Sequence, residues 1–218
     1  MTALIFDFDG TIVDTESPAH ESTAQIWSDH GVELDFEWWV EGLGTNRQGS
    51  WVHELERRLG REIDREAALA KRQRVKNAIT DRQPVLPGVA ELLGAATAAG
   101  LPLAVGSSSE HVWVDRHLER VELMPLFDHV VCRDDVGGRA KPAPDVFLRA
   151  VELLDVDPAQ VVVIEDSHNG VHAARAAGLR TLVVPNPLVA HLEFPDADWH
   201  LHALDARSPA DLLAELFA

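Results

Sequence analysis

The segment LIFDFDGT at residues 4–11 predicts a short apolar strand that ends in two acids and a glycine turn. Because side chains on a strand alternate, Asp7 and Asp9 leave the same side of the chain, about 6 to 7 Å apart. Two crowded carboxylates repel each other, which raises a pKa unless a cation or hydrogen-bond donors compensate. A hard cation such as Mg²⁺ meets that need. A plain strand end and turn is the alternative, since Asp and Gly are common turn residues.

Outward from that segment, short apolar stretches alternate with helical patterns over the C-terminal part of the chain. The stretch 161–164 consists only of β-branched residues, which is typical of a parallel strand buried on both faces. Further strands are expected at 101–106, 129–133 and 181–184, and helices at 89–99, 111–121, 145–154, 168–177 and 208–217. This alternation predicts an α/β protein with a Rossmann-like parallel sheet and helices on both faces. Ligands of such sheets bind at the carboxyl ends of the strands.

The residues between these two regions carry no strand pattern. Tryptophans and leucines recur at mainly helical spacings over 35–83, and the proline-rich segment PVLPG at residues 84–88 ends that pattern. We therefore expect a small all-helical insert after the first strand. The expected boundaries are 1–14 with 85–218 for the α/β core and 15–84 for the insert.

The charge of the chain limits its partners. The chain has 218 residues, 46% of them hydrophobic, and its formal net charge is -17, with 36 acidic and 19 basic side chains. This balance excludes general binding to nucleic acid or to an anionic membrane, which requires a basic face. An anionic substrate would have to find cations locally, which is a second reason to expect a metal ion.

The single cysteine, Cys132, rules out an intrachain disulfide and agrees with a reducing compartment. We expect it to be a core residue at a strand end. The N-terminus carries no basic region and its apolar run stops at Asp7, so neither a signal peptide nor a transmembrane helix is predicted. We therefore expect a soluble cytoplasmic protein that is monomeric or weakly dimeric.

Polar residues follow the predicted strands and are candidates for one shared site. Ser107, Ser108 and Ser109 come after the strand at 101–106 and, beside a helix start, would suit a phosphate. An ordinary serine-rich helix cap is the alternative. Lys141 precedes a proline and a helix start, which restrict the chain direction and so aim its ammonium. A solvated surface lysine is the alternative there.

Two adjacent acids, Glu165 and Asp166, directly follow the strand at 161–164. Adjacent acids at the mouth of a buried strand are difficult to explain by structure alone. Asp166 would complete an oxygen-rich set with Asp7 and Asp9 that suits six-coordinate Mg²⁺, with water and phosphate oxygens in the remaining positions.

Together these motifs resemble those of the haloacid dehalogenase-like superfamily, in the branch with a helical cap inserted after the first strand. The segment DFDGT at residues 7–11 resembles its first motif and Ser107 its second. Lys141 resembles the third motif, and the pair Glu165 and Asp166 the fourth. The order and spacing of all four motifs are right, and the match covers essentially the whole chain.

Two further segments narrow the resemblance. The segments VDTE at residues 13–16 and KPAPDVF at residues 141–147 are most similar to sugar-phosphate phosphatases, phosphoglycolate phosphatase and β-phosphoglucomutase. The resemblance implies a phosphatase in which Asp7 attacks phosphorus to form an aspartyl phosphate. Asp9 would protonate the leaving alkoxide and later deprotonate water.

The resemblance also implies a cofactor and a substrate. Mg²⁺ would be held by Asp7, the Asp9 backbone carbonyl and Asp166. Glu165 would either bind the ion directly or contact one of its ligands. Catalysis would also use Ser107 and Lys141, which hold the transferring group of a small phosphorylated metabolite. The expected substrate-binding residues are Arg47, Thr11, Ser108, Ser109, His20 and Lys76.

The specificity residues belong mostly to the insert. The loop GLGTNR at residues 42–47 resembles the specificity loop of mutase-like members, so Arg47 would bind the part of the substrate that does not react. An exposed arginine at a helix start is the alternative. His20 and Lys76 are possible further contacts from the insert, and solvated helix faces are the alternative for both.

Four other functions compete with the phosphatase. A β-phosphoglucomutase-like phosphomutase is the main one, although the sequence departs from the mutase pattern around Ser17 and Pro18. A dehalogenase or a phosphonate hydrolase is less favoured, because neither needs Asp9. A non-catalytic binding protein on the same fold is the remaining alternative.

Overall fold

The computed structural model describes residues 2–42 and 50–218. They divide into two compact units. One unit holds Pro84–Ala218 together with the N-terminal segment that ends at Val13, and the other is Asp14–Gln83. We describe each unit by itself.

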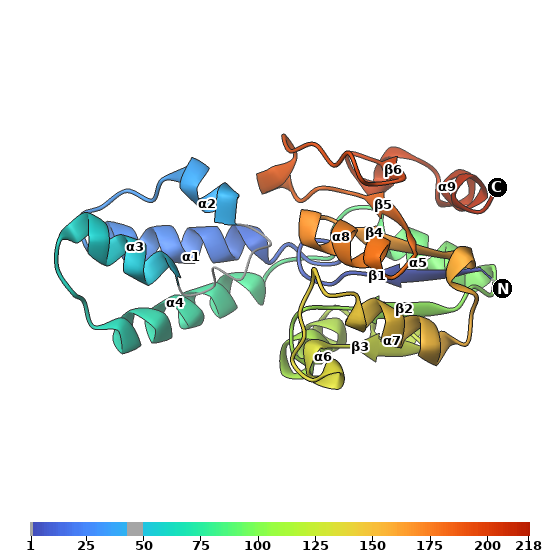
Figure 1. The fold of residues 1–218 in the computed structure, drawn as a ribbon, viewed down its shortest axis with the longest axis horizontal. Coiled ribbons are helices and arrows are strands. Elements are labelled where there is room, and N and C mark those ends of the chain that lie inside the picture. Colours follow the sequence, from blue (N-terminus) through green and yellow to red (C-terminus); the bar gives the residue numbers. More distant parts are fainter. Residues whose placement is uncertain (1, 43–49) are drawn as a thin grey trace. The chain divides into compact units, whose positions relative to one another are not determined.

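The first unit is built on one six-stranded sheet (Figure 1). The strand order is β3-β2-β1-β4-β5-β6, and every neighbouring pair is parallel. The predicted α/β fold class is therefore confirmed. The strands are β1 Ala3–Phe6, β2 Leu103–Gly106, β3 His129–Val131, β4 Val161–Glu165, β5 Arg180–Val183 and β6 Trp199–His200.

Helices cover both faces of this sheet, because strand side chains alternate between the faces. Leu4 and Phe6 of β1 pack with α5, α6 and α9, whereas Ala3 and Ile5 pack with α7 and α8. The helices are α5 Val89–Ala98, α6 His111–Arg120, α7 Asp145–Leu154, α8 His168–Ala176 and α9 Pro209–Leu216. Both faces of the central strands are thus buried under helices, as the β-branched run of β4 predicts.

The second unit is helical over its described residues. Its helices are α1 Glu16–Asp29, α2 Phe36–Gly42, α3 Ser50–Leu59 and α4 Arg65–Thr80. Buried Ile26 and Trp27 of α1 share a small core with Trp51 and Leu55 of α3. Helix α1 begins at Glu16, so Pro18 falls in its first turn, where the missing N–H of proline costs nothing.

Two further differences come from local hydrogen bonding. Strand β3 ends at Val131, and Arg133 begins a 3-10 turn, Arg133–Val136, instead of extending the strand. Strand β6 was not predicted, because two residues are too few to show a period. Cys132 is fully buried at the end of β3, as expected. Among the described residues no helix has both the length and the apolar character that a membrane span requires.

Candidate active site

Asp7 lies at the carboxyl end of β1, where the strand order reverses between β1 and β4. Its backbone N–H donates to the Ile164 carbonyl oxygen at 2.9 Å, which extends the pairing of the two strands by one residue. The residue is only 6% exposed. Because a buried carboxylate requires hydrogen bonds or an opposite charge, the groups around Asp7 decide its chemistry. In open parallel sheets this reversal point is where ligands bind.

Lys141 supplies the opposite charge. Its ammonium donates to Asp7 Oδ1 and, at 2.7 Å, to Glu165 Oε1, and the lysine side chain is 4% exposed. The ammonium also lies 4.5 Å from the centroid of the Phe147 ring on α7. The Lys141 backbone N–H donates to Ser108 Oγ at 3.0 Å. These contacts hold the ammonium between the ends of β1 and β4.

Burial sets the ionisation of this pair. Desolvation raises the pKa of Asp7 to about 8, Lys141 opposes that rise, and the charges of Glu165 and Asp9 add to it. Burial acts to lower the pKa of Lys141, but the two carboxylates outweigh it and the net direction is upward. Lys141 therefore keeps its positive charge. Further positive charge beside Asp7 would favour its carboxylate form.

Glu165 ends β4 and is fully buried. Besides the bond from Lys141 to Oε1, its Oε2 accepts from the backbone N–H groups of Asp166 and Ser167 and from Ser167 Oγ, each at 2.9 Å. Gly170 on α8 makes room for this carboxylate, because a methyl group there would lie 1.7 Å from its carboxyl carbon. Both oxygens of Glu165 are thus used within the protein.

Asp166 is the next residue and lies against the turn that follows β1. It is 4% exposed. Gly10, with a φ of +85°, makes this approach possible, since a methyl group at Gly10 would lie 2.0 Å from Asp166 Oδ2. The glycine of the first motif is therefore required both for its backbone conformation and for the space beside it.

These acids fit a divalent cation. One carboxylate oxygen from each of Asp7, Glu165 and Asp166 lies within 4.8 Å of the other two, and all three residues are buried. Three acids against the one ammonium of Lys141 leave an excess of negative charge. Hard carboxylate oxygens are the ligands that Mg²⁺ prefers. Because Glu165 already uses both of its oxygens, Asp7 and Asp166 are the better ligands.

Asp9 is held by two donors that come from outside the first strand. Ser109 Oγ donates to Asp9 Oδ2 at 2.5 Å, and the Trp113 indole N–H donates to Asp9 Oδ1 at 2.9 Å. Trp113 belongs to α6, and its ring packs edge-on against His117 with centroids 4.3 Å apart. The sequence interpretation missed Trp113; its place in the first turn of the helix after the serine run was the available signal.

The other candidates of the core lie near this centre in different ways. Ser107 is fully buried, and its Oγ accepts from the Ser109 N–H at 3.0 Å. Ser108 and Ser109 contact Lys141 and Asp9 respectively, so both support candidate catalytic groups. Thr11 is buried, and its Oγ1 has no hydrogen-bond partner among the described residues.

The candidates of the insert belong to the other unit. Arg47 lies outside the described residues. His20 is on α1, with its ring edge against Phe36 and Trp39, and desolvation lowers the pKa of its imidazole. Lys76 is on α4.

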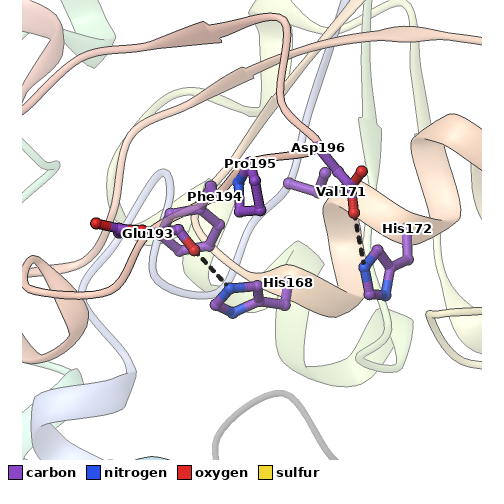
Figure 2. Close-up of a pocket in the computed structure, with 7 residues that line it drawn as sticks. All are labelled: His168, Val171, His172, Glu193, Phe194, Pro195 and Asp196. Atoms are coloured by element: carbon purple, nitrogen blue, oxygen red, sulfur yellow. Dashed lines mark hydrogen bonds and ion pairs between the residues drawn. The ribbon is translucent and has the colours of Figure 1, made fainter.

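A separate pocket of about 370 Å³ lies beside α8 (Figure 2). His168 Nε2 lies 2.8 Å from the carbonyl oxygen of Glu193, and the His168 ring stacks on the Phe194 ring. His172 lies 3.5 Å from Asp196. The pocket is lined by His168, Val171, His172, Glu193, Phe194, Pro195 and Asp196. None of the strand-end candidates lines it, so it is distinct from the cluster around Asp7.

Comparison with known proteins agrees with this geometry. A family model described as a haloacid dehalogenase-like hydrolase matches residues 1–178. YhcW of Bacillus subtilis is 35% identical over 214 residues, which are 98% of this chain and 97% of that protein. The fructose-1-phosphate phosphatase YqaB of Escherichia coli is 35% identical over 179 residues, which are 81% of this chain and 92% of that protein.

A solved structure shows the same likeness in three dimensions. It is that of a CbbY mutant of Rhodobacter sphaeroides in complex with xylulose-1,5-bisphosphate. It matches with a TM-score of 0.73 and 27% identity over 94% of this chain and 96% of that one.

Proposed function

This chain belongs to the haloacid dehalogenase-like hydrolase family, and on that premise we propose that it is a Mg²⁺-dependent phosphatase of a small phosphorylated metabolite. The family resemblance expected from the motifs is confirmed, and so is the expectation of a hydrolase. The observation that carries the proposal is the buried contact between Asp7 and Lys141 at the end of β1. It places a nucleophile beside a cation that can hold an anionic substrate.

Asp7 attacks the phosphorus atom, and the leaving alkoxide is replaced by the aspartate in an aspartyl phosphate. Asp9 donates a proton to that alkoxide and then takes one from the water that hydrolyses the intermediate, so the enzyme returns to its starting state. Ser109 and Trp113 orient the Asp9 carboxylate for both steps.

Lys141 holds both the nucleophile and the transferring group. Glu165 keeps the lysine in place through its 2.7 Å contact. Asp7, the Asp9 carbonyl and Asp166 would hold Mg²⁺, which when bound neutralises charge on the phosphoryl oxygens. Positive charge beside Asp7 would favour its carboxylate form, which is the form that attacks phosphorus.

The substrate is a sugar phosphate or a similar metabolite. The names of YqaB and of the CbbY complex both point to this class. Arg47, His20 and Lys76 from the insert are the residues we propose for the part of the substrate that does not react. In this proposal the insert is a cap domain that supplies specificity, while the α/β unit supplies chemistry.

Release of inorganic phosphate tests the function. With Mg²⁺ present, the protein should hydrolyse p-nitrophenyl phosphate and, faster, one member of a panel of phosphorylated metabolites. Asp7→Asn should abolish turnover, whereas Asp155→Asn should not, because Asp155 is exposed and its φ of +52° suits asparagine. Conversion of a sugar 1-phosphate to the 6-phosphate without phosphate release would establish the mutase instead. A folded protein inert towards every substrate would support the binding-protein alternative.

A further inference from the structure

A second group of side chains that could hold a metal ion lies in the α/β unit and shares no residue with the group of Asp7, Glu165 and Asp166. His111 is the first residue of α6, Cys132 follows β3, and Asp134 lies in the 3-10 turn after it. One nitrogen, sulfur or oxygen atom from each lies within 4.8 Å of the other two. The pairing of β2 with β3 brings these residues together, because His111 follows β2 in the chain while Cys132 and Asp134 follow β3.

The imidazole of His111 lies between two carboxylates. Its Nε2 is 2.7 Å from Asp135 Oδ2, and its Nδ1 is 3.0 Å from Asp115 Oδ1. A histidine that binds a metal normally donates its other N–H to a carboxylate, which fixes the orientation of the ring. Both ring nitrogens contact an acid, so a metal ion would replace one of these two contacts while the remaining acid orients the ring.

The sulfur of Cys132 is placed as an acceptor. It accepts the backbone N–H of Asp135, and the Asp135 carboxylate in turn accepts the Cys132 N–H at 2.8 Å. Burial and the neighbouring acids raise the pKa of this thiol, so an entering metal ion must displace its proton, because the thiolate is the form that binds metals. Burial keeps competing thiols away from this sulfur.

The charge around the cluster also favours a cation. Asp115 and Asp135 contact the His111 ring, Asp134 accepts the His111 backbone N–H at 3.3 Å, and the neighbouring Arg133 is paired with Glu110 at 2.6 Å. Three acids therefore lie against His111. A divalent ion in place of the imidazole proton would balance this charge better than the proton does.

We propose that His111, Cys132 and Asp134 form a second cation site, which takes a borderline divalent transition metal such as Zn²⁺. A mixed nitrogen, sulfur and oxygen donor set suits Zn²⁺, whereas Mg²⁺ requires oxygen ligands. Asp115 or water completes the tetrahedron. On binding, the thiol proton and any proton on the ligating nitrogen leave to solvent. The site is independent of the proposed function and is tested without turnover.

Cobalt(II) is the probe, because a bond from thiolate to cobalt gives a near-ultraviolet charge-transfer band that oxygen and nitrogen ligands do not give. Cys132 is the only cysteine of the chain, so the band reports this site alone. Titration of the full chain with Co²⁺ in excess Mg²⁺ should produce the band at one equivalent, and Zn²⁺ should remove it. Cobalt binding without the band would overturn the proposal.

Variants locate the remaining ligands. His111→Ala keeps the thiol and should weaken cobalt binding at least tenfold, and Asp135→Asn should weaken it by about 10- to 100-fold, as loss of an orienting partner does. Cys132→Ser should lose the band, with folding checked by circular dichroism. The controls Glu119→Gln, exposed on the same helix, and His53→Ala, an exposed histidine of the other unit, should bind as the wild type does. An unchanged affinity in His111→Ala would show that cobalt merely contacts the cysteine, and would refute the site.

Discussion

Replacement of Gly170 by alanine should destabilise the protein although the position is helical. In an ordinary helix, alanine in place of glycine adds about 1 kcal/mol of stability. At Gly170 the added methyl group would lie 1.7 Å from the Glu165 carboxyl carbon and from its Oε1. Two atoms cannot share that space, so the carboxylate has to leave its position.

The size of the effect follows from the bonds of Glu165. A displaced carboxylate loses the 2.7 Å bond from Lys141 and at least one of the bonds to the Asp166 and Ser167 N–H groups. A hydrogen bond to a charged group contributes about 1.5 to 3 kcal/mol. After subtraction of the helical gain, we expect Gly170→Ala to lower the free energy of unfolding by about 2 to 5 kcal/mol.

Urea denaturation followed by circular dichroism measures this change. The matched control is Gly94→Ala on α5, where no atom lies within 4 Å of the added methyl group. The two substitutions should have opposite effects on stability: Gly94→Ala should raise the urea midpoint and Gly170→Ala should lower it. Turnover should fall with Gly170→Ala as well, since Lys141 loses one of its two carboxylate partners. Equal stabilisation by both substitutions would refute the packing of Glu165 that we describe.

Three predictions concern the chemistry. Asp9→Asn should lower kcat by about 10²- to 10⁴-fold, the usual contribution of general acid–base catalysis, while substrate affinity in a binding assay stays near wild type; a loss under threefold would remove Asp9 from this role. Trp113→Phe keeps an aromatic ring but no donor, so kcat should fall about tenfold with KM unchanged, from loss of one bond to a charged group; an effect on KM alone would contradict the positioning role. Asp166→Asn should raise the Mg²⁺ concentration for half-maximal rate far more than Gly94→Ala does, and chelation by EDTA should abolish the wild-type rate until Mg²⁺ is returned; full activity after exhaustive chelation would exclude the metal.

The sequence by itself determined the fold class and the approximate place of the candidate site. A run of four β-branched residues before Glu165, and an apolar run before Asp7, predict parallel strands buried on both faces. Parallel strands end at the same edge of their sheet, so acids that follow two of them meet there. This can be predicted without knowing any contact between side chains. The spacing of apolar residues within each strand or helix is enough for this prediction, because it shows whether one face or both faces of that element are buried.

Only the tertiary structure decided what each polar group does at that edge. Glu165 and Asp166 are adjacent and chemically alike, yet one is held by Lys141 and the loop N–H groups while the other lies over Gly10. Ser109, a substrate-binding candidate from the sequence, donates to Asp9. The bonds from Lys141 and Ser109 join residues more than twenty positions apart, and the position of Asp166 depends on the space that a glycine leaves. A local pattern does not encode such partners, because a hydrogen bond is decided by distance and direction between atoms that the fold alone brings together.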